Sequence, residues 1–214
     1  RQLGDIVFYD DDPTSTVSVV QPPQREDKHP NRAIVVNGKS DGSLLGDYTT
    51  MAMLALVPAL FAGHPEPCFV IGWGTGATAG ERGALAETRE VQVAEISQGV
   101  LDAAPLFAEG NLAASSNPKI RTFRGDAYRT LLQSPDVFDV IVSEPSNPWV
   151  TGVEMLYSIE FLTAAKEHLA PGGVYGQWFH LYEIDGESVE LVLRNYAAVF
   201  PNVSRVFRVD PSTN

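Results

Sequence analysis

Residues 68–80 read CFVIGWGTGATAG, an apolar run followed by glycines at every second position. The run Phe69–Ile71 predicts a buried strand, and the residues from Ala77 onward favour a helix. A strand that turns through glycines into a helix brings backbone N–H groups and the positive end of the helix close to a ligand. Such turns also occur as plain tight connections. As a ligand site, this turn would use Gly72, Gly74, Thr75 and Gly76.

A second strand is predicted over Val91–Glu95, and it ends in an acid. An acidic side chain at that strand tip is placed to accept hydrogen bonds from both hydroxyls of a ribose. The glycine turn and Glu95 therefore predict a nucleoside site, to which we also assign the next residue, Ile96. Dinucleotide oxidoreductases and S-adenosylmethionine enzymes both use this pair of features, so the pair alone does not identify the cofactor.

Composition narrows the class of protein. The chain has 214 residues and a hydrophobic fraction of 44%, enough for one α/β domain with a small appendage. Its formal net charge of −12 argues against nucleic acid as a partner, because phosphate binding needs clustered Lys and Arg. The charge suits a cationic substrate such as an amine, and also suits a generally acidic surface. No apolar run approaches the roughly 18–20 residues of a membrane span.

Two regions differ in pattern. Residues 1–45 predict a small antiparallel sheet of about three strands, at 5–10, 16–20 and 33–38, which we interpret as a lid or a dimer platform. Residues 46–214 alternate strands with helices, which predicts a doubly wound, mostly parallel sheet that we expect to be incomplete at its C-terminal end. The predicted helices are 47–60, 77–87, 97–107, 127–133, 154–168 and 186–199, and the predicted strands are 68–72, 91–95, 120–124, 138–142, 173–179 and 203–209.

Ligands of such sheets bind beyond the carboxyl ends of the strands. Asp126 and Ala127 follow the third predicted strand of the large sheet. The Asp126 carboxylate could accept a hydrogen bond from an exocyclic amine such as that of adenine, or it could simply cap the next helix.

The loop after the fourth strand, residues 143–149, reads SEPSNPW. Two prolines stiffen it, and it carries an acid, Glu144, an amide, Asn147, and an indole, Trp149. An acid at this strand tip could take the proton from an attacking amine, or could steer that amine as a cation. Proline-rich loops also serve as plain connections.

The chain resembles the polyamine aminopropyltransferases, the spermidine synthase family, and most of all the membrane-fused branch in which this domain follows transmembrane helices. The resemblance covers nearly the whole chain. The glycine turn is generic, whereas the Glu-Pro-Ser-Asn-Pro-Trp loop and Gln177-Trp178 are much more specific. The segments that carry the resemblance are 36–43, the glycine turn, 125–127, 143–151, 169–174 and 177–178.

This resemblance implies a Rossmann-like fold of the S-adenosylmethionine methyltransferase type. It also implies transfer of an aminopropyl group from decarboxylated S-adenosylmethionine to a small amine, with release of methylthioadenosine and without a metal. By position, Glu95 would hold the ribose, Asp126 the adenine amine, and Glu144 would act as the general base. The residues assigned to the acceptor are Asn147, Gln177, Asp47, Trp149 and Tyr182. The family further implies a homodimer and a domain facing the cytoplasm, tethered to the inner or plasma membrane by segments outside this chain.

Several positions depart from the family pattern. Thr75 stands where the family has an Asp that pairs with the donor ammonium, and Thr50 and Met51 stand where a Tyr-His pair is usual. Glu144 and Asn147 replace two aspartates. Ordinary S-adenosylmethionine therefore remains open as the donor, as in an N-methyltransferase, and so does a non-catalytic nucleoside-binding module. A nicotinamide oxidoreductase fits least, because it gives the loop at 144–149 no role.

Overall fold

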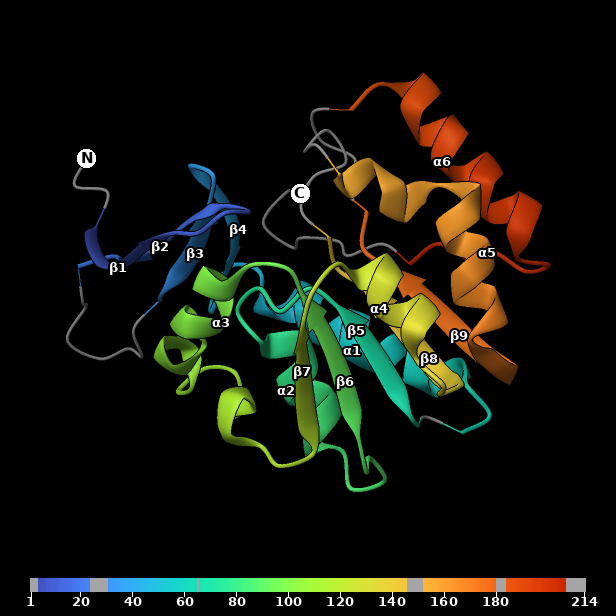
Figure 1. The fold of residues 1–214 in the computed structure, drawn as a ribbon, viewed down its shortest axis with the longest axis horizontal. Coiled ribbons are helices and arrows are strands. Elements are labelled where there is room, and N and C mark those ends of the chain that lie inside the picture. Colours follow the sequence, from blue (N-terminus) through green and yellow to red (C-terminus); the bar gives the residue numbers. More distant parts are fainter. Residues whose placement is uncertain (1–3, 24–30, 65, 146–151, 180–183, 207–214) are drawn as a thin grey trace, which may run out of the picture.

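The computed structural model describes residues 4–23, 31–64, 66–145, 152–179 and 184–206, which form two sheets and the helices around them (Figure 1). The larger sheet has five strands in the order β7-β6-β5-β8-β9, and every neighbouring pair is parallel. The smaller sheet is an antiparallel meander in the order β1-β2-β3-β4. The predicted α/β architecture is therefore confirmed.

The strands of the large sheet lie between two layers of helices, as alternating strands and helices require. β5 is buried on both faces, which explains its uninterrupted apolar sequence. The strands are β5 (Cys68–Ile71), β6 (Val91–Glu95), β7 (Ile120–Arg124), β8 (Phe138–Ser143) and β9 (Leu169–Gln177). The helices are α1 (Tyr48–Phe61), α2 (Ala77–Ala84), α3 (Gln98–Ala103), α4 (Ala127–Gln133), α5 (Ile159–Glu167) and α6 (Gly186–Val199).

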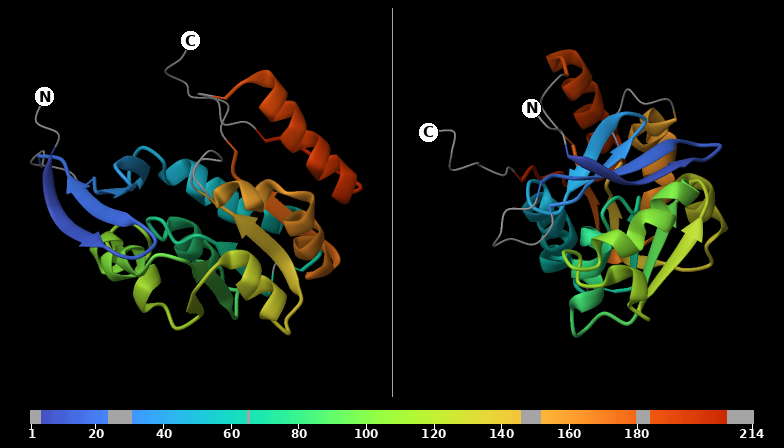
Figure 2. Two further views of the ribbon diagram at one scale, coloured as in Figure 1. Left: turned by 45° about the horizontal axis from the view of Figure 1, so that its top comes forward. Right: turned by 90° about the vertical axis from the view of Figure 1, so that its left-hand side faces the viewer.

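Two apolar clusters cover the two faces of this sheet. Val70 and Val140 contribute to one cluster together with α2, α3 and the small sheet, while Phe69 and Ile141 contribute to the other together with α4, α5 and α6. Neighbouring residues of a strand point to opposite faces, so β5 and β8 serve both clusters. The small sheet and α6 lie at opposite ends of the molecule (Figures 1 and 2).

The small sheet has four strands rather than the predicted three: β1 (Asp5–Asp11), β2 (Thr16–Gln21), β3 (Ala33–Val36) and β4 (Lys39–Ser43). The sequence of β4, KSDGS, lacks the apolar alternation of a strand. It pairs with β3 because Asn37 and Gly38, both with positive φ, reverse the chain in a tight hairpin turn. The predicted division of the chain after residue 45 stays a prediction.

Several predicted elements differ in the structure. β9 begins at Leu169, four residues before the strand predicted at 173–179, and α2 ends at Ala84 rather than at residue 87. The helix at 97–107 is α3 followed by the 3₁₀ helix η1 (Ala104–Phe107), because Pro105 lacks the N–H that a continuing α-helix needs. The helix at 154–168 is the 3₁₀ helix η3 (Val153–Tyr157) followed by α5, where the Ser158 side chain caps a new start. The strand predicted at 203–209 is wrong for residues 203–206, which pair with no described strand, and residues 207–209 lie outside the described residues. A further 3₁₀ helix, η2, spans Ala114–Ser116.

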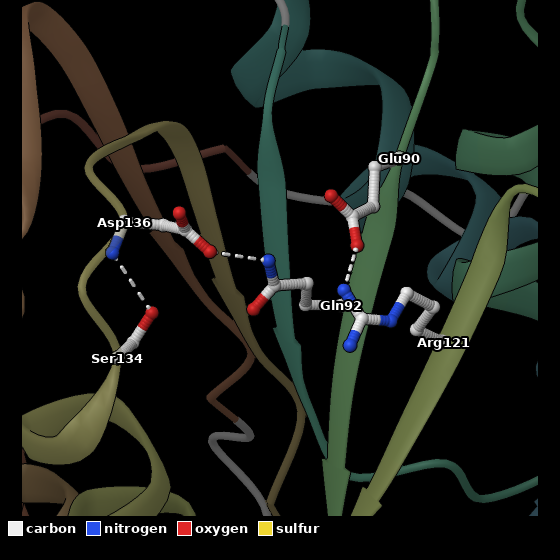
Figure 3. A network of polar contacts seen from close by, with 5 residues as sticks. All are labelled: Glu90, Gln92, Arg121, Ser134 and Asp136. Carbon is white, nitrogen blue, oxygen red and sulfur yellow. Dashed lines mark hydrogen bonds and ion pairs between the residues drawn. The ribbon is translucent and has the colours of Figure 1, made fainter.

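Polar contacts also tie together the amino ends of the large sheet's strands (Figure 3). The Gln92 amide, buried in β6, donates to Asp136 at 2.8 Å, and Arg121 of β7 forms an ion pair with Glu90 at 2.8 Å. These contacts lie at the opposite end of the strands from the expected ligand edge. These two contacts link β6 to its surroundings at the amino ends of the strands, and they do not form part of the expected ligand site. Among the described helices, none has both the length and the apolar character needed to cross a bilayer.

The β1–β2 turn docks onto the large domain through Asp12. One carboxylate oxygen of Asp12 accepts from the Ser97 hydroxyl at 2.6 Å and from the Gly99 N–H at 2.9 Å, while the other accepts from Thr14 and Ser15 within the turn. Partial burial acts to raise the pKa of Asp12, but the hydrogen bonds from Ser97, Thr14 and Gly99 outweigh it and hold that pKa well below its usual range. Asp12 is therefore ionised and clamps the small sheet to the start of α3.

We expect Asp12→Ala to lower the free energy of unfolding by about 1–2 kcal/mol at neutral pH, because Ser97 and Gly99 lose their acceptor. Urea denaturation measures this loss. Since the folded-state pKa is lowered, the stabilisation is present above the ordinary Asp pKa, and the difference between the two proteins should shrink as the pH falls below about 4.

The control for this change is Asp5→Ala, which removes an exposed acid at the start of β1. Equal stability of Asp12→Ala and the unmodified chain would show that the turn is not clamped in solution.

Candidate active site

The carboxyl ends of the five parallel strands are held in one row by backbone hydrogen bonds from the residues that follow β5, β7, β8 and β9. Glu144 N–H donates to Ile71 O at 3.1 Å, and Gly72 N–H donates to Ala94 O at 2.9 Å. The outer strands follow the same rule, with Gly125 N–H donating to Glu95 O and Trp178 N–H to Ser143 O, both at 2.9 Å. The strand tips singled out by the sequence therefore meet at one edge.

The glycine turn joins β5 to α2 as predicted. Gly76, with φ +78°, occupies the N-cap position of α2, and no side chain caps this helix. Gly72, with φ +88°, packs so closely on the next loop that a Cβ there would lie 3.0 Å from the Glu144 carbonyl oxygen. The buried Asn111 amide donates to Thr75 O at 2.8 Å and fixes the turn from below. Both glycines are thus required by conformation and by space, since a Cβ on Gly76 would lie 2.8 Å from the Asn111 amide nitrogen.

Glu95 lies at the tip of β6 beside this turn, and only 8% of it is exposed. Its two carboxylate oxygens accept from the backbone N–H groups of Trp73 and Ser97, each at 2.8 Å. Burial raises the pKa of Glu95, the backbone hydrogen bonds lower it, and the charge of Asp41 raises it further, with a net upward shift. The two N–H groups hold the carboxylate in place, and its remaining lone pairs can accept from a ligand hydroxyl.

Glu144 follows β8 and is partly buried in the cleft. Burial raises its pKa to about 7; the hydrogen bond from Thr78 opposes this shift, while the charges of Asp47 and Asp41 add to it. The Thr78 hydroxyl donates to the Glu144 carboxylate at 2.5 Å from the first turn of α2. A carboxylate with this pKa is close to half protonated at neutral pH, which suits proton transfer.

Asp126 and Ala127 lie at the start of α4, and both line the cleft. One Asp126 carboxylate oxygen accepts from the Arg129 N–H at 2.8 Å, so the helix-capping interpretation holds. This hydrogen bond uses one carboxylate oxygen of Asp126, whose side chain is exposed and borders the cleft. The predicted contact with a ligand amine therefore stays compatible with capping, and it stays a prediction. Ile96, half exposed, borders the same part of the cleft.

The acceptor-side residues are placed in part. Gln177 ends β9, where its amide accepts from the Tyr175 hydroxyl at 2.6 Å and donates to Trp178 O at 3.0 Å. Asp47 precedes α1 and accepts from the Ser43 hydroxyl at 2.8 Å. Both line the cleft. Asn147, Trp149 and Tyr182 lie outside the described residues.

Two of the departures from the family pattern touch one another. The Thr75 hydroxyl lies 3.1 Å from the Met51 sulfur, and both residues are buried. Two uncharged side chains therefore meet where the family pattern has an Asp in the glycine turn and a His on the preceding helix. The glycine turn supplies no anion to the cleft.

One cavity of about 1660 Å³ is bordered by most of the predicted site residues that the structure describes, namely Asp47, Gly72, Gly74, Thr75, Glu95, Ile96, Asp126, Ala127, Glu144 and Gln177. Gly76 does not line it. The volume exceeds the roughly 300–1,000 Å³ typical of small-molecule sites, so a nucleoside and a second substrate fit together. The charged residues among its described lining are Asp41, Asp47, Glu95, Asp126, Glu144 and Arg205. Five acids and one arginine favour a cationic ligand over an anionic one. The described residues contain no cluster of His, Cys, Asp and Glu suited to a metal ion.

Sequence reasoning missed four contributors: Asp12, Asp41, Thr78 and Asn111. Thr78 and Asn111 act through contacts 66 and 36 residues away in the chain, and no local pattern reports such contacts. Asp41 carried a weak signal, since it lies in a segment quoted for the family resemblance. Asp12 lies between the strands predicted at 5–10 and 16–20, where the sequence pattern indicated no contact.

Comparison with known proteins gives a consistent result. Residues 48–212 match the family model described as the spermine/spermidine synthase domain. The chain is 25% identical over 185 residues to a spermidine synthase from Dictyostelium discoideum, covering 84% of this chain and 63% of the relative. It is 26% identical over 145 residues to a polyamine aminopropyltransferase from Escherichia fergusonii, covering 67% of this chain and 50% of the relative. The chain thus spans between half and two thirds of the length of these relatives.

Solved structures show the same fold. A crystal structure of spermidine synthase in complex with the transition state analogue AdoDATO superposes with a TM-score of 0.82 at 19% identity, covering 92% of this chain and 66% of that chain. Spermidine synthase from Thermotoga maritima gives a TM-score of 0.79 at 19% identity, covering 92% and 65%.

Thr78→Val is expected to raise the pKa of Glu144 above about 7, because it removes the hydroxyl that stabilises the ionised carboxylate. Infrared or carbon-13 NMR titration of the carboxyl measures this shift directly. Thr49→Val, on the exposed surface of α1, is the matched control. An unchanged or lowered pKa would show that Thr78 does not donate to Glu144.

Glu95→Gln is expected to weaken methylthioadenosine binding about tenfold or more, on the scale of one or two lost charge-assisted hydrogen bonds. Calorimetry gives the dissociation constant, and circular dichroism verifies the fold. Glu90→Gln makes the same chemical change at the opposite end of β6 and should leave binding unaltered. Equal affinity of Glu95→Gln and the unmodified chain would remove Glu95 from the site.

Proposed function

The chain belongs to the spermine/spermidine synthase domain family, and from this premise we propose that it transfers an aminopropyl group from decarboxylated S-adenosylmethionine to a small amine. Glu144 is the proposed general base. The sugar of the donor lies at Glu95 and its adenine near Ile96 and Asp126. The assignment to the membrane-fused branch, the homodimer and the membrane-tethered domain facing the cytoplasm stay predictions.

One observation carries this proposal: the Glu144 carboxyl, held by the Thr78 hydroxyl, borders an acidic cleft where burial raises its pKa to about 7. A base must be ionised to accept a proton yet basic enough to hold it, and a pKa near the working pH satisfies both needs. The excess of acids supports a substrate and a donor that are both cations. Glu144 is also fixed, because its backbone N–H continues the sheet and Thr78 holds its side chain.

The reaction is a direct displacement. The acceptor nitrogen attacks the carbon next to the donor sulfur, the C–N bond forms, the C–S bond breaks, and the sulfur leaves as neutral methylthioadenosine. The new ammonium loses one proton to Glu144. Since the positive sulfur already activates the carbon, the chain contributes alignment of the two substrates and a place for the proton.

A second candidate, methyl transfer from ordinary S-adenosylmethionine, is favoured by one observation. Thr75 brings no negative charge to the donor arm, so it does not repel the carboxylate that ordinary S-adenosylmethionine retains. The five acids of the cleft argue the other way, because they oppose that same carboxylate. Calorimetry with both donors distinguishes the candidates: tighter binding of the decarboxylated form supports aminopropyl transfer. Donor binding without turnover on any amine would instead support a non-catalytic nucleoside-binding module.

Glu144→Gln is expected to reduce kcat by at least about a hundredfold while leaving the affinity for methylthioadenosine nearly intact. In the unmodified chain, kcat should rise with pH up to about 7 and then level off, since the pKa of Glu144 is raised and only its ionised form accepts the proton. Glu154→Gln, in η3, provides a matched control. A wild-type rate in Glu144→Gln would exclude Glu144 as the base.

A further inference from the structure

Asp41 lies on β4 at the boundary between the small sheet and the glycine turn. Its neighbour Gly42 is buried against that turn, where a Cβ would lie 3.5 Å from the Thr75 side chain and 3.9 Å from the Met51 sulfur. Asp41 itself lines the cleft. A strand of the small sheet therefore brings the Asp41 carboxylate to the cleft and its neighbour Gly42 to the turn that lacks an acid.

The position of Asp41 relative to the other acids is informative. Its charge contributes to the raised pKa of both Glu95 and Glu144, so it lies within electrostatic reach of the sugar-binding acid and of the base. The reactive part of a donor, its positive sulfur and the arm beyond it, has to span the region between those two residues. Among the other acids of the described lining, Asp41 is the one whose charge acts on both Glu95 and Glu144.

We propose that Asp41 binds the positively charged arm of the donor and makes the cleft select decarboxylated over ordinary S-adenosylmethionine. This inference rests on the proposed function. The carboxylate attracts the arm ammonium and repels the carboxylate that ordinary S-adenosylmethionine carries on the same arm. The small sheet, expected to be a lid or platform, then contributes directly to donor specificity.

The test is calorimetry with three nucleosides on the unmodified chain and on Asp41→Asn. Decarboxylated S-adenosylmethionine should bind about tenfold more weakly to Asp41→Asn, the loss expected for one charge-assisted contact. Methylthioadenosine, which has neither the positive sulfur nor the ammonium, should bind almost equally to both proteins. The preference for decarboxylated over ordinary S-adenosylmethionine should shrink.

Two further variants sharpen the test. Asp5→Asn makes the same change of charge in the same sheet at an exposed site away from the cleft, and should alter none of the three affinities. Asp41→Glu keeps the charge and should retain most of the preference for the decarboxylated donor.

The outcomes are separable. An unchanged affinity of Asp41→Asn for the decarboxylated donor, or an equal loss for all three nucleosides, would overturn the role of Asp41 while leaving the nucleoside site intact. Failure of the unmodified chain to bind any of the three would overturn the proposed function as well.

Discussion

The site depends on one structural constraint, which is that backbone hydrogen bonds continue the parallel sheet one residue past the end of β5, β7, β8 and β9. Because Gly72, Glu144, Gly125 and Trp178 each donate a backbone hydrogen bond to the neighbouring strand, the following side chains cannot move independently. Parallel strands all present their carboxyl ends at one edge, so segments far apart in the chain converge there. The glycine turn and the loop at Glu144 are then close enough for Gly72 to pack against the Glu144 carbonyl.

The same geometry concentrates negative charge. Burial raises the pKa values of Glu95 and Glu144, because it disfavours their ionised forms. The charge of Asp41 adds to both shifts, and the charge of Asp47 adds to that of Glu144. Hydrogen bonds from Trp73, Ser97 and Thr78 limit these shifts and hold each carboxyl in place. A site of this kind costs stability while empty and gains from a cationic ligand, which links the electrostatics of the cleft to the substrates that we propose.

The small sheet is part of the site rather than an addition to it. Asp12 accepts from the Ser97 hydroxyl, and the Ser97 N–H donates to Glu95, so a chain of contacts joins the β1–β2 turn to the acid at the tip of β6. At the other end of this sheet, β4 brings Asp41 to the cleft. The sequence led us to interpret this region as a lid or a dimer platform. The pattern of residues 1–45 alone gave no sign of these contacts with the large sheet and its helices.

The sequence by itself determined the alternation of strands and helices, the glycine turn, and the acids that follow the strands, because periodicity and turn residues are local properties. It also indicated the family. It did not determine β4, whose polar residues pair only because Asn37 and Gly38 reverse the chain, nor the break in the helix at Pro105. Only the tertiary structure decided that Thr78 holds Glu144, that Asn111 supports the turn, and that Thr75 meets Met51. Such contacts join residues distant in the chain, and their burial and charge depend on every element packed around them.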